Sequence, residues 1–299
     1  MNNPIQALPD DLHDTISSLT LIAKAKLARF LQPNKSNSAQ NVPASVRAAA
    51  YHLSSGGQRI RLRLALHACL ALKVSSEDAI AIATCAELLH NASLIHDDLQ
   101  DRDGFRRGRK SVWAAFGDNI AICSGDLLLS SAYAALASFS KPNLLPVLVA
   151  LTHSRTALAI AGQCADLAVT GPISIAAYEK IAIAKSGALL SLPVELALVA
   201  SGHAEWQPQA SLAANAFSIG YQIVDDIDDV ERDTSKGGSA AALNILLVLN
   251  TSGKEANTLA SARNLALQHL RCAAKAAELL PMRSGRLMQE LALRLSVRL

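Results

Sequence analysis

The sequence predicts an all-α protein, and three observations favour this fold class. Only 4% of the residues are aromatic although 51% are hydrophobic, and Ala, Leu and Ile dominate, which is typical of closely packed helices. Apolar residues recur at helical spacing along most of the chain, and strand-like alternation is nowhere sustained. A length of 299 residues allows one large domain or two modest ones. Because no fixed-period repeat or low-complexity linker appears, we expect one domain over residues 1–299.

The N-terminal half is predicted to hold several helices separated by stretches rich in turn-forming residues. The expected ranges are about 11–31, 44–53, 59–72 and a longer helix that begins at Ser75 or Ser76. Either serine can cap that helix, because Glu77 and Asp78 follow in its first turn. Its apolar run continues into the aspartate-rich stretch LIHDDLQDRD, and a basic loop, DGFRRGRKS, comes next.

The C-terminal half shows the same alternation of helical patterns and breaks. The breaks fall at SKPN, TGPIS, HAEWQP, SKGG and LPMRSG. The expected helices cover about 119–138, 143–169, 175–202, 208–232, 240–250, 254–279 and 284–298.

Two aspartate clusters of the form D-D-x-x-D are the most informative motifs in the chain. They consist of Asp97, Asp98 and Asp101, and of Asp225, Asp226 and Asp229. On a helix, this spacing presents the carboxylates on one side. Two unit charges about 4 Å apart interact by roughly 4 kcal/mol at an effective dielectric constant near 20, so such clusters require cations. Oxygen ligands without cysteine favour Mg²⁺, which shares its coordination with substrate phosphates, so we expect a diphosphate substrate.

Basic residues follow the first cluster closely. Arg106 and Arg107, with Arg109 and Lys110 nearby, carry guanidinium groups that suit bidentate contact with phosphate oxygens. A solvated basic loop is the alternative, but the position beside the carboxylates favours phosphate binding.

The turn GGQRIR and one histidine are weaker candidates. Glycines allow the backbone to approach a phosphate, although Gly56 and Gly57 can equally be a simple chain reversal. His90 lies seven residues before Asp97, on the same side of the predicted helix. A histidine in the core, with its hydrogen bonds satisfied, is the alternative for His90.

Further polar residues interrupt apolar helices in the C-terminal half. Lys185 and Ser186 lie in IAIAKSGALL, where a lysine with its stem along the apolar surface is the alternative to a functional one. Gln222 lies three residues before Asp225 and shares its side of the helix. Gln163 and Asp166, which follow Gly162, are either functional or a structural hydrogen-bonded pair.

Bulk properties narrow the class of protein. A net charge of +3 gives no case for nucleic-acid binding. Five cysteines without C-x-x-C spacing, each in an apolar helical context, indicate buried thiols in a reducing cytoplasm. The N-terminus has no pattern of a signal peptide, and the interrupted apolar runs predict no transmembrane segment.

Together these motifs resemble the trans-polyprenyl diphosphate synthases, over a span from Gly56 to about Lys236. The resemblance implies an isoprenoid-synthase-type helical bundle around a deep central cavity, usually a homodimer. It also implies an enzyme that condenses isopentenyl diphosphate with an allylic diphosphate through an allylic carbocation.

The resemblance assigns roles to individual residues. All six aspartates of the two clusters would hold Mg²⁺ on the allylic diphosphate, and the catalytic residues would be Asp97, Asp98, Asp101, Lys185 and Asp225. The allylic diphosphate would contact Arg106, Lys185, Gln222 and Lys236, with Ser186 in place of the commoner threonine. Isopentenyl diphosphate would contact Arg61, His90, Arg107 and Gln58.

Two departures from the family pattern leave other functions open. Gln58 stands where the family normally has lysine, and the sequence after Asp229 lacks a fuller lysine- and aspartate-bearing loop. These departures are compatible with a noncatalytic subunit that modulates another prenyl synthase. A class I terpene cyclase also ionises a diphosphate at aspartates, but it needs no second diphosphate site.

The resemblance also implies that side chains beneath the first cluster limit the length of the product. Ala92 and Ser93 are small, so we expect the cavity to admit more than a farnesyl chain, and we expect a C20 geranylgeranyl product. Leu89, Leu128 or Tyr133 are candidates for a deeper floor.

Overall fold

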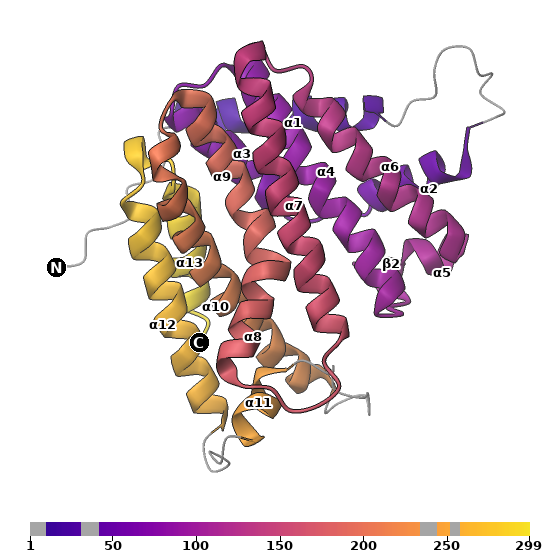
Figure 1. Cartoon of the computed structure of the whole chain (residues 1–299), viewed down its shortest axis with the longest axis vertical. Coiled ribbons are helices and arrows are strands. Elements are labelled where there is room, and N and C mark those ends of the chain that lie inside the picture. Colours follow the sequence, from indigo (N-terminus) through magenta and orange to yellow (C-terminus); the bar gives the residue numbers. More distant parts are fainter. Residues whose placement is uncertain (1–9, 31–41, 234–243, 252–257) are drawn as a thin grey trace. The chain divides into compact units, whose positions relative to one another are not determined.

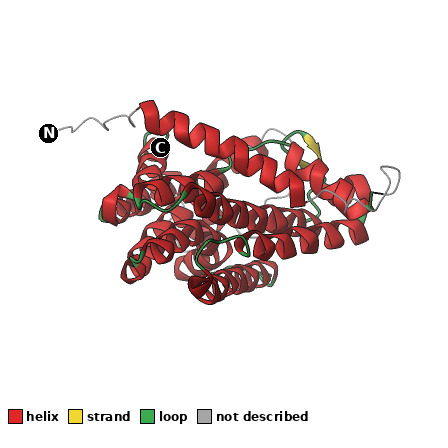
Figure 2. Ribbon diagram, turned by 90° about the horizontal axis from the view of Figure 1, so that it is seen from above, coloured by secondary structure: helices red, strands yellow, loops and turns green. Residues whose placement is uncertain are grey.

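The computed structural model describes residues 10–30, 42–233, 244–251 and 258–299. Helices make up most of this described part, which confirms the all-α prediction (Figure 2). The contacts divide the chain into two compact units, residues 1–150 and 151–299, which are described separately below. The expectation of a single domain stays a prediction.

The first unit is built around α4, which packs against α1, α3 and α6 (Figure 1). Its elements are α1 (Asp10–Phe30), α2 (Ala44–Ser54), α3 (Ile60–Ala71), α4 (Ser76–Gln100), β1 (Phe105–Arg106), β2 (Arg109–Lys110), α5 (Val112–Phe116), α6 (Asp118–Leu136), the 3₁₀ turn η2 (Pro142–Leu144) and the start of α7 (Leu145–Leu167).

The start of α4 is held by two polar contacts. Ser75 caps the helix, because its hydroxyl accepts a hydrogen bond of 3.2 Å from the Asp78 amide. Asp78 itself is buried, and its carboxylate accepts bonds of 2.7 Å from both the amide and the hydroxyl of Ser140. The helix therefore begins at a defined residue, which sets where its far end places the first aspartate cluster.

The predicted basic loop contains a short hairpin that the sequence patterns did not indicate. Strands β1 and β2 are antiparallel and are joined by Arg107 and Gly108, with φ angles of 53° and 75°. Two consecutive positive φ angles are typical of the type I′ turn that matches the twist of a hairpin. The hairpin is attached to α2, because Arg109 stacks 4.1 Å from the ring centroid of Tyr51.

The second unit contains the end of α7 and the remaining helices, among which α10 packs against α9 and α12 (Figure 1). Its other elements are α8 (Ile175–Ala182), the π-helical turn η3 (Ile183–Gly187), α9 (Ala188–Ser201), η4 (Ala204–Trp206), α10 (Gln207–Asp233), α11 (Ile245–Thr251), α12 (Thr258–Glu278), η6 (Pro281–Arg283) and α13 (Arg286–Ser296).

The cysteine prediction is partly wrong. No disulfide joins the five cysteines, and Cys69 and Cys85 are buried, but Cys123, Cys164 and Cys272 are exposed. The apolar context did not reveal this because neighbouring positions on a helix face different directions.

Three helical stretches have the length and composition of membrane-spanning helices. They are Asp118–Leu136, Pro142–Leu167 and Ile175–Ser201, of which the most apolar windows are 44%, 22% and 78% buried. Length and composition alone thus do not support the expected lack of a transmembrane segment, which stays a prediction.

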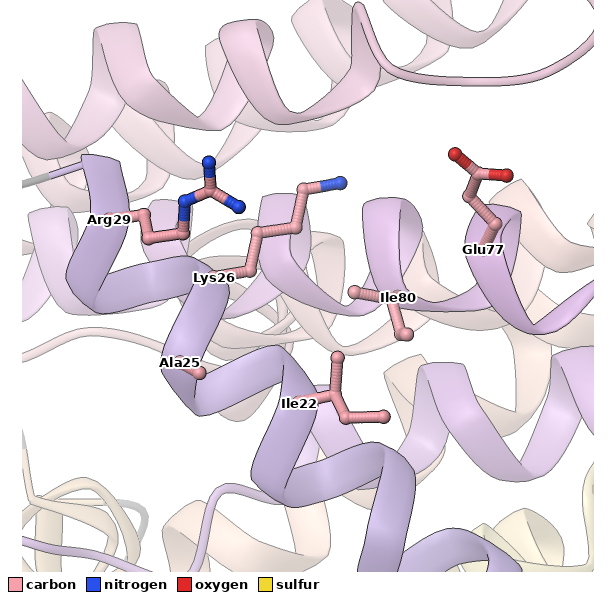
Figure 3. A pocket seen from close by; sticks show the side chains of 6 residues that line it. All are labelled: Ile22, Ala25, Lys26, Arg29, Glu77 and Ile80. Carbon is pink, nitrogen blue, oxygen red and sulfur yellow. The ribbon is translucent and has the colours of Figure 1, made fainter.

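A pocket of about 710 Å³ lies in the first unit between α1 and the start of α4. Ile22 of α1 and Ile80 of α4 face one another there, beside Lys26, Arg29 and Glu77 (Figure 3). The six residues that line it include no predicted site residue.

Candidate active site

The first aspartate cluster lies at the C-terminal end of α4, as predicted. The Asp101 amide donates a bond of 2.8 Å to the Asp97 carbonyl and closes the last turn. Asp97 is half-buried, Asp98 is fully buried and Asp101 is exposed. The three carboxylates therefore experience different environments, although the sequence pattern treats them alike.

Arg106 is bound directly to the buried member of this cluster. Its Nε donates a bond of 2.5 Å to Asp98 Oδ1, and the Arg106 and Asp98 side chains are 28% and 0% exposed. Burial raises the pKa of Asp98, and the hydrogen bond from Arg106 opposes the rise. Burial also disfavours the charge of Arg106, but the bond to Asp98 outweighs it and raises the pKa of Arg106. The hairpin thus brings the Arg106 guanidinium to the carboxylates.

Arg107 is directed to a different partner, the glycine turn between α2 and α3. Its Nη1 donates a bond of 2.5 Å to the carbonyl oxygen of Gly56. A Cβ on Gly57, where φ is 111°, would lie 2.5 Å from the Arg107 guanidinium carbon. Glycine at this position therefore lets the backbone approach the guanidinium, which the sequence alone did not separate from a simple turn.

His90 and Arg61 form the centre of a cationic cluster. Arg61 Nη1 lies 3.2 Å from His90 Nε2, and this ring nitrogen must accept because a guanidinium can only donate. Burial, with the charges of Arg61, Arg107 and Arg106, lowers the pKa of His90 well below its usual value. His90 is therefore neutral and lies among arginine side chains, and its role in substrate binding stays a prediction.

A buried network that the sequence reasoning missed supports the glycine turn. Arg59, which has a left-handed φ of 50°, donates a bond of 2.9 Å to Glu87 of α4. Glu87 also accepts from the Leu62 amide and from Asn91, at 3.3 and 3.0 Å. His52 completes the network at 3.1 Å from Asn91. The one available signal was Glu87, a lone acidic residue in an apolar run.

The second aspartate cluster lies within α10, and its members also differ in burial. Asp225 is half-buried, Asp229 is exposed and Asp226 is 4% exposed. Gln222 is directed to this cluster, where its Nε2 donates a bond of 2.9 Å to Asp226 Oδ1. Burial raises the pKa of Asp226 to about 6, against the opposing effect of the hydrogen bonds from Gln222, the Ile245 amide and Tyr178.

Lys185 and Ser186 lie in the π-helical turn η3, where the sequence predicted an uninterrupted helix. Such turns occur often at functional sites. The ammonium of Lys185 donates to the carboxylate of Asp166 on α7. Gly162 permits this packing, because a Cβ there would lie 2.3 Å from the Lys185 amide nitrogen. Asp166 is therefore paired with Lys185, which the sequence did not anticipate.

Two of the predicted substrate-binding residues, Gln58 and Lys236, are not among the contacts described above. Gln58 is exposed, and Lys236 lies outside the described residues. In the first unit the structure brings together Arg61, His90 and Arg107 near the glycine turn, and Arg106 with Asp98. In the second unit it joins Lys185 to Asp166 and Gln222 to Asp226.

The residues present fit a Mg²⁺ site completed by substrate. Within the described part of the chain, no group of three or more His, Cys, Asp or Glu side chains is arranged to hold a metal by itself. Mg²⁺ needs only one or two carboxylates when phosphates supply further ligands. The buried Oδ2 of Asp98 has no hydrogen-bond partner among the described residues, so an oxygen ligand is available at the first cluster.

Comparison with known proteins gives the same family as the motifs. A sequence model described as polyprenyl synthetase matches residues 43–245. A chloroplastic geranylgeranyl pyrophosphate synthase from Capsicum annuum is 33% identical over 218 residues, which cover 69% of this chain and 59% of that protein. A (2E,6E)-farnesyl diphosphate synthase from Mycobacterium tuberculosis is 36% identical over 174 residues, 57% of this chain and 48% of that protein.

A solved structure shares the fold. The geranylgeranyl pyrophosphate synthetase from the archaeon Geoglobus acetivorans superimposes with a TM-score of 0.81 at 23% identity, covering 94% of this chain and 99% of that one. This similarity confirms the isoprenoid-synthase-type fold. The chain spans about half to three fifths of the length of the two curated relatives. From the family match and the shared motifs, the chain belongs to the polyprenyl synthetase family.

Proposed function

We propose that this protein is a prenyltransferase that condenses isopentenyl diphosphate with an allylic diphosphate. The observation that carries the proposal is the divergence of two adjacent arginines. Arg106 binds the carboxylate cluster through Asp98, whereas Arg107 binds the glycine turn through Gly56. Two neighbouring guanidiniums directed to different surroundings suit two diphosphates, and a cyclase needs only one.

The allylic diphosphate is assigned to the aspartate clusters and their cations. Arg106, Lys185 and Gln222 bind and orient its oxygens, with Lys236 as a further contact. Asp97, Asp98, Asp101, Asp225 and Asp229 would hold Mg²⁺, which would neutralise charge on the departing diphosphate. Asp226, to which the resemblance assigns the same role, accepts hydrogen bonds from Tyr178 and the Ile245 amide instead. Lys185 and Arg106 are already paired with Asp166 and Asp98, so these cations are positioned before substrate arrives.

The reaction then follows from charge stabilisation. The allylic C–O bond breaks, and its electron pair leaves with the diphosphate, whose negative charge the cationic side chains stabilise. The double bond of isopentenyl diphosphate forms the new C–C bond with the allylic cation. A proton passes from the adduct to the departing diphosphate, and the product is five carbons longer. Exclusion of water protects the cation from hydrolysis.

Isopentenyl diphosphate is assigned to the cluster of Arg61, His90 and Arg107. Gln58 offers an amide where the family normally offers an ammonium. Since a hydrogen bond to a charged group contributes roughly 1.5–3 kcal/mol, weaker binding of this substrate is expected, without loss of turnover.

The proposed product is C20 geranylgeranyl diphosphate. Ala92, which is 2% exposed, and the half-buried Ser93 lie five and four residues before Asp97, and both are small. One relative carries the name of a geranylgeranyl synthase and the other that of a farnesyl synthase. The Ala92→Phe variant should therefore shorten the product, and an unchanged product would place the floor at deeper residues such as Leu128.

We also propose a cytoplasmic homodimer, which family membership and the sequence pattern favour. Size-exclusion chromatography with light scattering measures the assembly state. A monomer, or activity only with a second protein, would contradict the homodimer.

One assay tests the proposed function, because each candidate function predicts a different product. Purified protein is incubated with Mg²⁺, isopentenyl diphosphate and allylic diphosphates of increasing length, and the products are separated by chromatography. Elongated products support the proposal. Cyclic hydrocarbons would identify a terpene cyclase, and inactivity with every primer would favour a noncatalytic subunit.

A further inference from the structure

The carboxylate of Asp226 is shared by three elements of the second unit. Oδ2 accepts bonds of 2.8 Å from the Tyr178 hydroxyl of α8 and from the Ile245 amide at the start of α11. Oδ1 accepts from Gln222 of α10. A carboxylate offers about four lone-pair sites, so most of the hydrogen-bonding capacity of Asp226 is already used.

A second contact attaches α11 to the same residue. The side-chain nitrogen of Asn244 donates a bond of 3.2 Å to the backbone carbonyl oxygen of Asp226. Its side-chain oxygen accepts a bond of 2.9 Å from the Leu246 amide and so caps the first turn of α11. The start of α11 is therefore joined to α10 at one residue, through both its side chain and its backbone.

Tyr178 has no access to water that could replace its hydrogen bond to Asp226. Its side chain is fully buried, and its hydroxyl donates to Asp226. A buried hydroxyl without a partner is destabilising, so Tyr178 and Asp226 stabilise each other's positions. Tyr178 was not identified as a site residue from the sequence.

The burial of Asp226 contrasts with that of its neighbours in the cluster. Asp225 and Asp229 are four positions apart and share one side of α10, whereas Asp226 is rotated by about 100° from Asp225. Asp225 is half-buried and Asp229 is exposed, but Asp226 is 4% exposed. The side chain of Asp226 is thus directed into the interior of the second unit, where it contacts Tyr178 and the Ile245 amide.

We infer that Tyr178 is a positioning residue of the second aspartate cluster, which acts through Asp226 to fasten the start of α11 to α10. In this assignment Asp226 is an internal anchor, and its contribution to diphosphate binding is indirect. The inference rests on the proposed function for its catalytic consequence, but the anchoring itself is independent of activity.

Three variants separate an anchor from a metal ligand. Tyr178→Phe removes one donor, Asp226→Asn weakens the shared carboxylate, and Asp225→Asn changes the neighbouring carboxylate. We expect the first two to increase amide hydrogen exchange in residues 245–251 by about 3- to 10-fold, as loss of one hydrogen bond implies. Asp225→Asn should leave that exchange unchanged.

Kinetics provide the second readout. Tyr178→Phe and Asp226→Asn should raise KM for the allylic diphosphate, whereas the Mg²⁺ concentration for half-maximal rate stays near that of the wild type. Asp225→Asn should raise this Mg²⁺ requirement. The double variant Tyr178→Phe with Asp226→Asn should be little worse than Asp226→Asn alone, because both act through one contact. Tyr221→Phe, at a tyrosine of α10 that is 43% exposed, is the matched control.

The outcomes that overturn the inference are distinct from failure of the proposed function. If Tyr178→Phe leaves exchange in residues 245–251 at the level of Tyr221→Phe, the anchor does not exist. If Asp226→Asn raises the Mg²⁺ requirement as Asp225→Asn does, Asp226 is a ligand. If the wild type elongates no primer, the proposed function fails, and the exchange measurements still decide the anchor.

Discussion

Arg106 and Asp98 form an ion pair in which the guanidinium is 28% exposed and the carboxylate is fully buried. The pair joins the hairpin to the last turn of α4 through a bond of 2.5 Å. Because one partner has no access to water, loss of either charge leaves the other poorly solvated.

Asp98→Asn should lower the free energy of unfolding substantially. Removing one partner of a buried ion pair is destabilising by roughly 3–5 kcal/mol, and partial exposure of Arg106 places the expected value at the lower end. Urea-induced unfolding measures the change. Asp118→Asn is the matched control, because the Arg102–Asp118 pair is 60% and 48% exposed and should contribute about 1 kcal/mol or less. Equal effects of the two substitutions would contradict the structural account.

Gly57→Ala should impair binding of isopentenyl diphosphate more than Gly56→Ala. Both positions have a positive φ, which is unfavourable for alanine by roughly 1–2 kcal/mol. Only at Gly57 would the new Cβ meet the Arg107 guanidinium, at 2.5 Å, whereas nothing lies within 4 Å of a Cβ at Gly56. Gly57→Ala should therefore raise KM for isopentenyl diphosphate several-fold above that of Gly56→Ala. Identical KM values for the two variants would show that displacing the Arg107 guanidinium does not affect binding of isopentenyl diphosphate.

Gly162→Ala should disturb the turn that carries Lys185. The new Cβ would lie 2.3 Å from the Lys185 amide nitrogen and 2.6 Å from the carbonyl carbon of Ala184, and backbone atoms cannot move aside easily. We expect a loss of at least about 2 kcal/mol in stability, as for other overpacked sites, and a lower kcat. Gly171→Ala is the control, because nothing lies within 4 Å of its Cβ. If Gly162→Ala retained the wild-type kcat, the geometry of the π-helical turn would not matter for catalysis.

His52 should make the stability of the protein depend on pH in the acidic range. Burial, with the charges of Arg107, Arg106 and Arg59, lowers the pKa of His52 to about 3 from a usual value of 6.5. The folded state keeps His52 neutral while the unfolded chain takes up a proton below pH 6.5. Its contribution to stability is therefore complete above pH 6.5 and decreases as pH falls toward 3, by up to about 1.4 kcal/mol per pH unit.

His52→Gln tests this pH dependence directly. Glutamine retains a donor for Asn91, to which His52 is bound at 3.1 Å, but it has no titrating group. The free energy of unfolding, measured between pH 7 and pH 4, should decrease less steeply in the variant than in the wild type. Parallel curves for the two proteins would exclude His52 as a source of the slope.

Much of the fold could be predicted because helices are local. The predicted range 44–53 became α2 at Ala44–Ser54, and the capping serine before α4 proved to be Ser75. The hairpin and the π-helical turn escaped prediction, because Arg107 takes its conformation from tertiary contacts and η3 packs against Gly162. Short elements of this kind carry little periodic signal.

The candidate site was predicted as a set of residues but not as a set of contacts. Residue type and spacing identified both aspartate clusters, Lys185 and the arginine pair, since carboxylates at helical spacing require cations whatever the fold. Spacing could not identify Glu87 or Tyr178, whose partners Arg59 and Asp226 are distant in sequence.

The sequence by itself determined the helical class, the family and the chemistry of the carboxylate clusters. Only the tertiary structure decided which carboxylates face inward, since Asp98 and Asp226 are buried with internal partners while Asp101 and Asp229 are exposed. The physical reason is that residue type sets what a side chain can bind, whereas desolvation and the available donors depend on the elements packed around it.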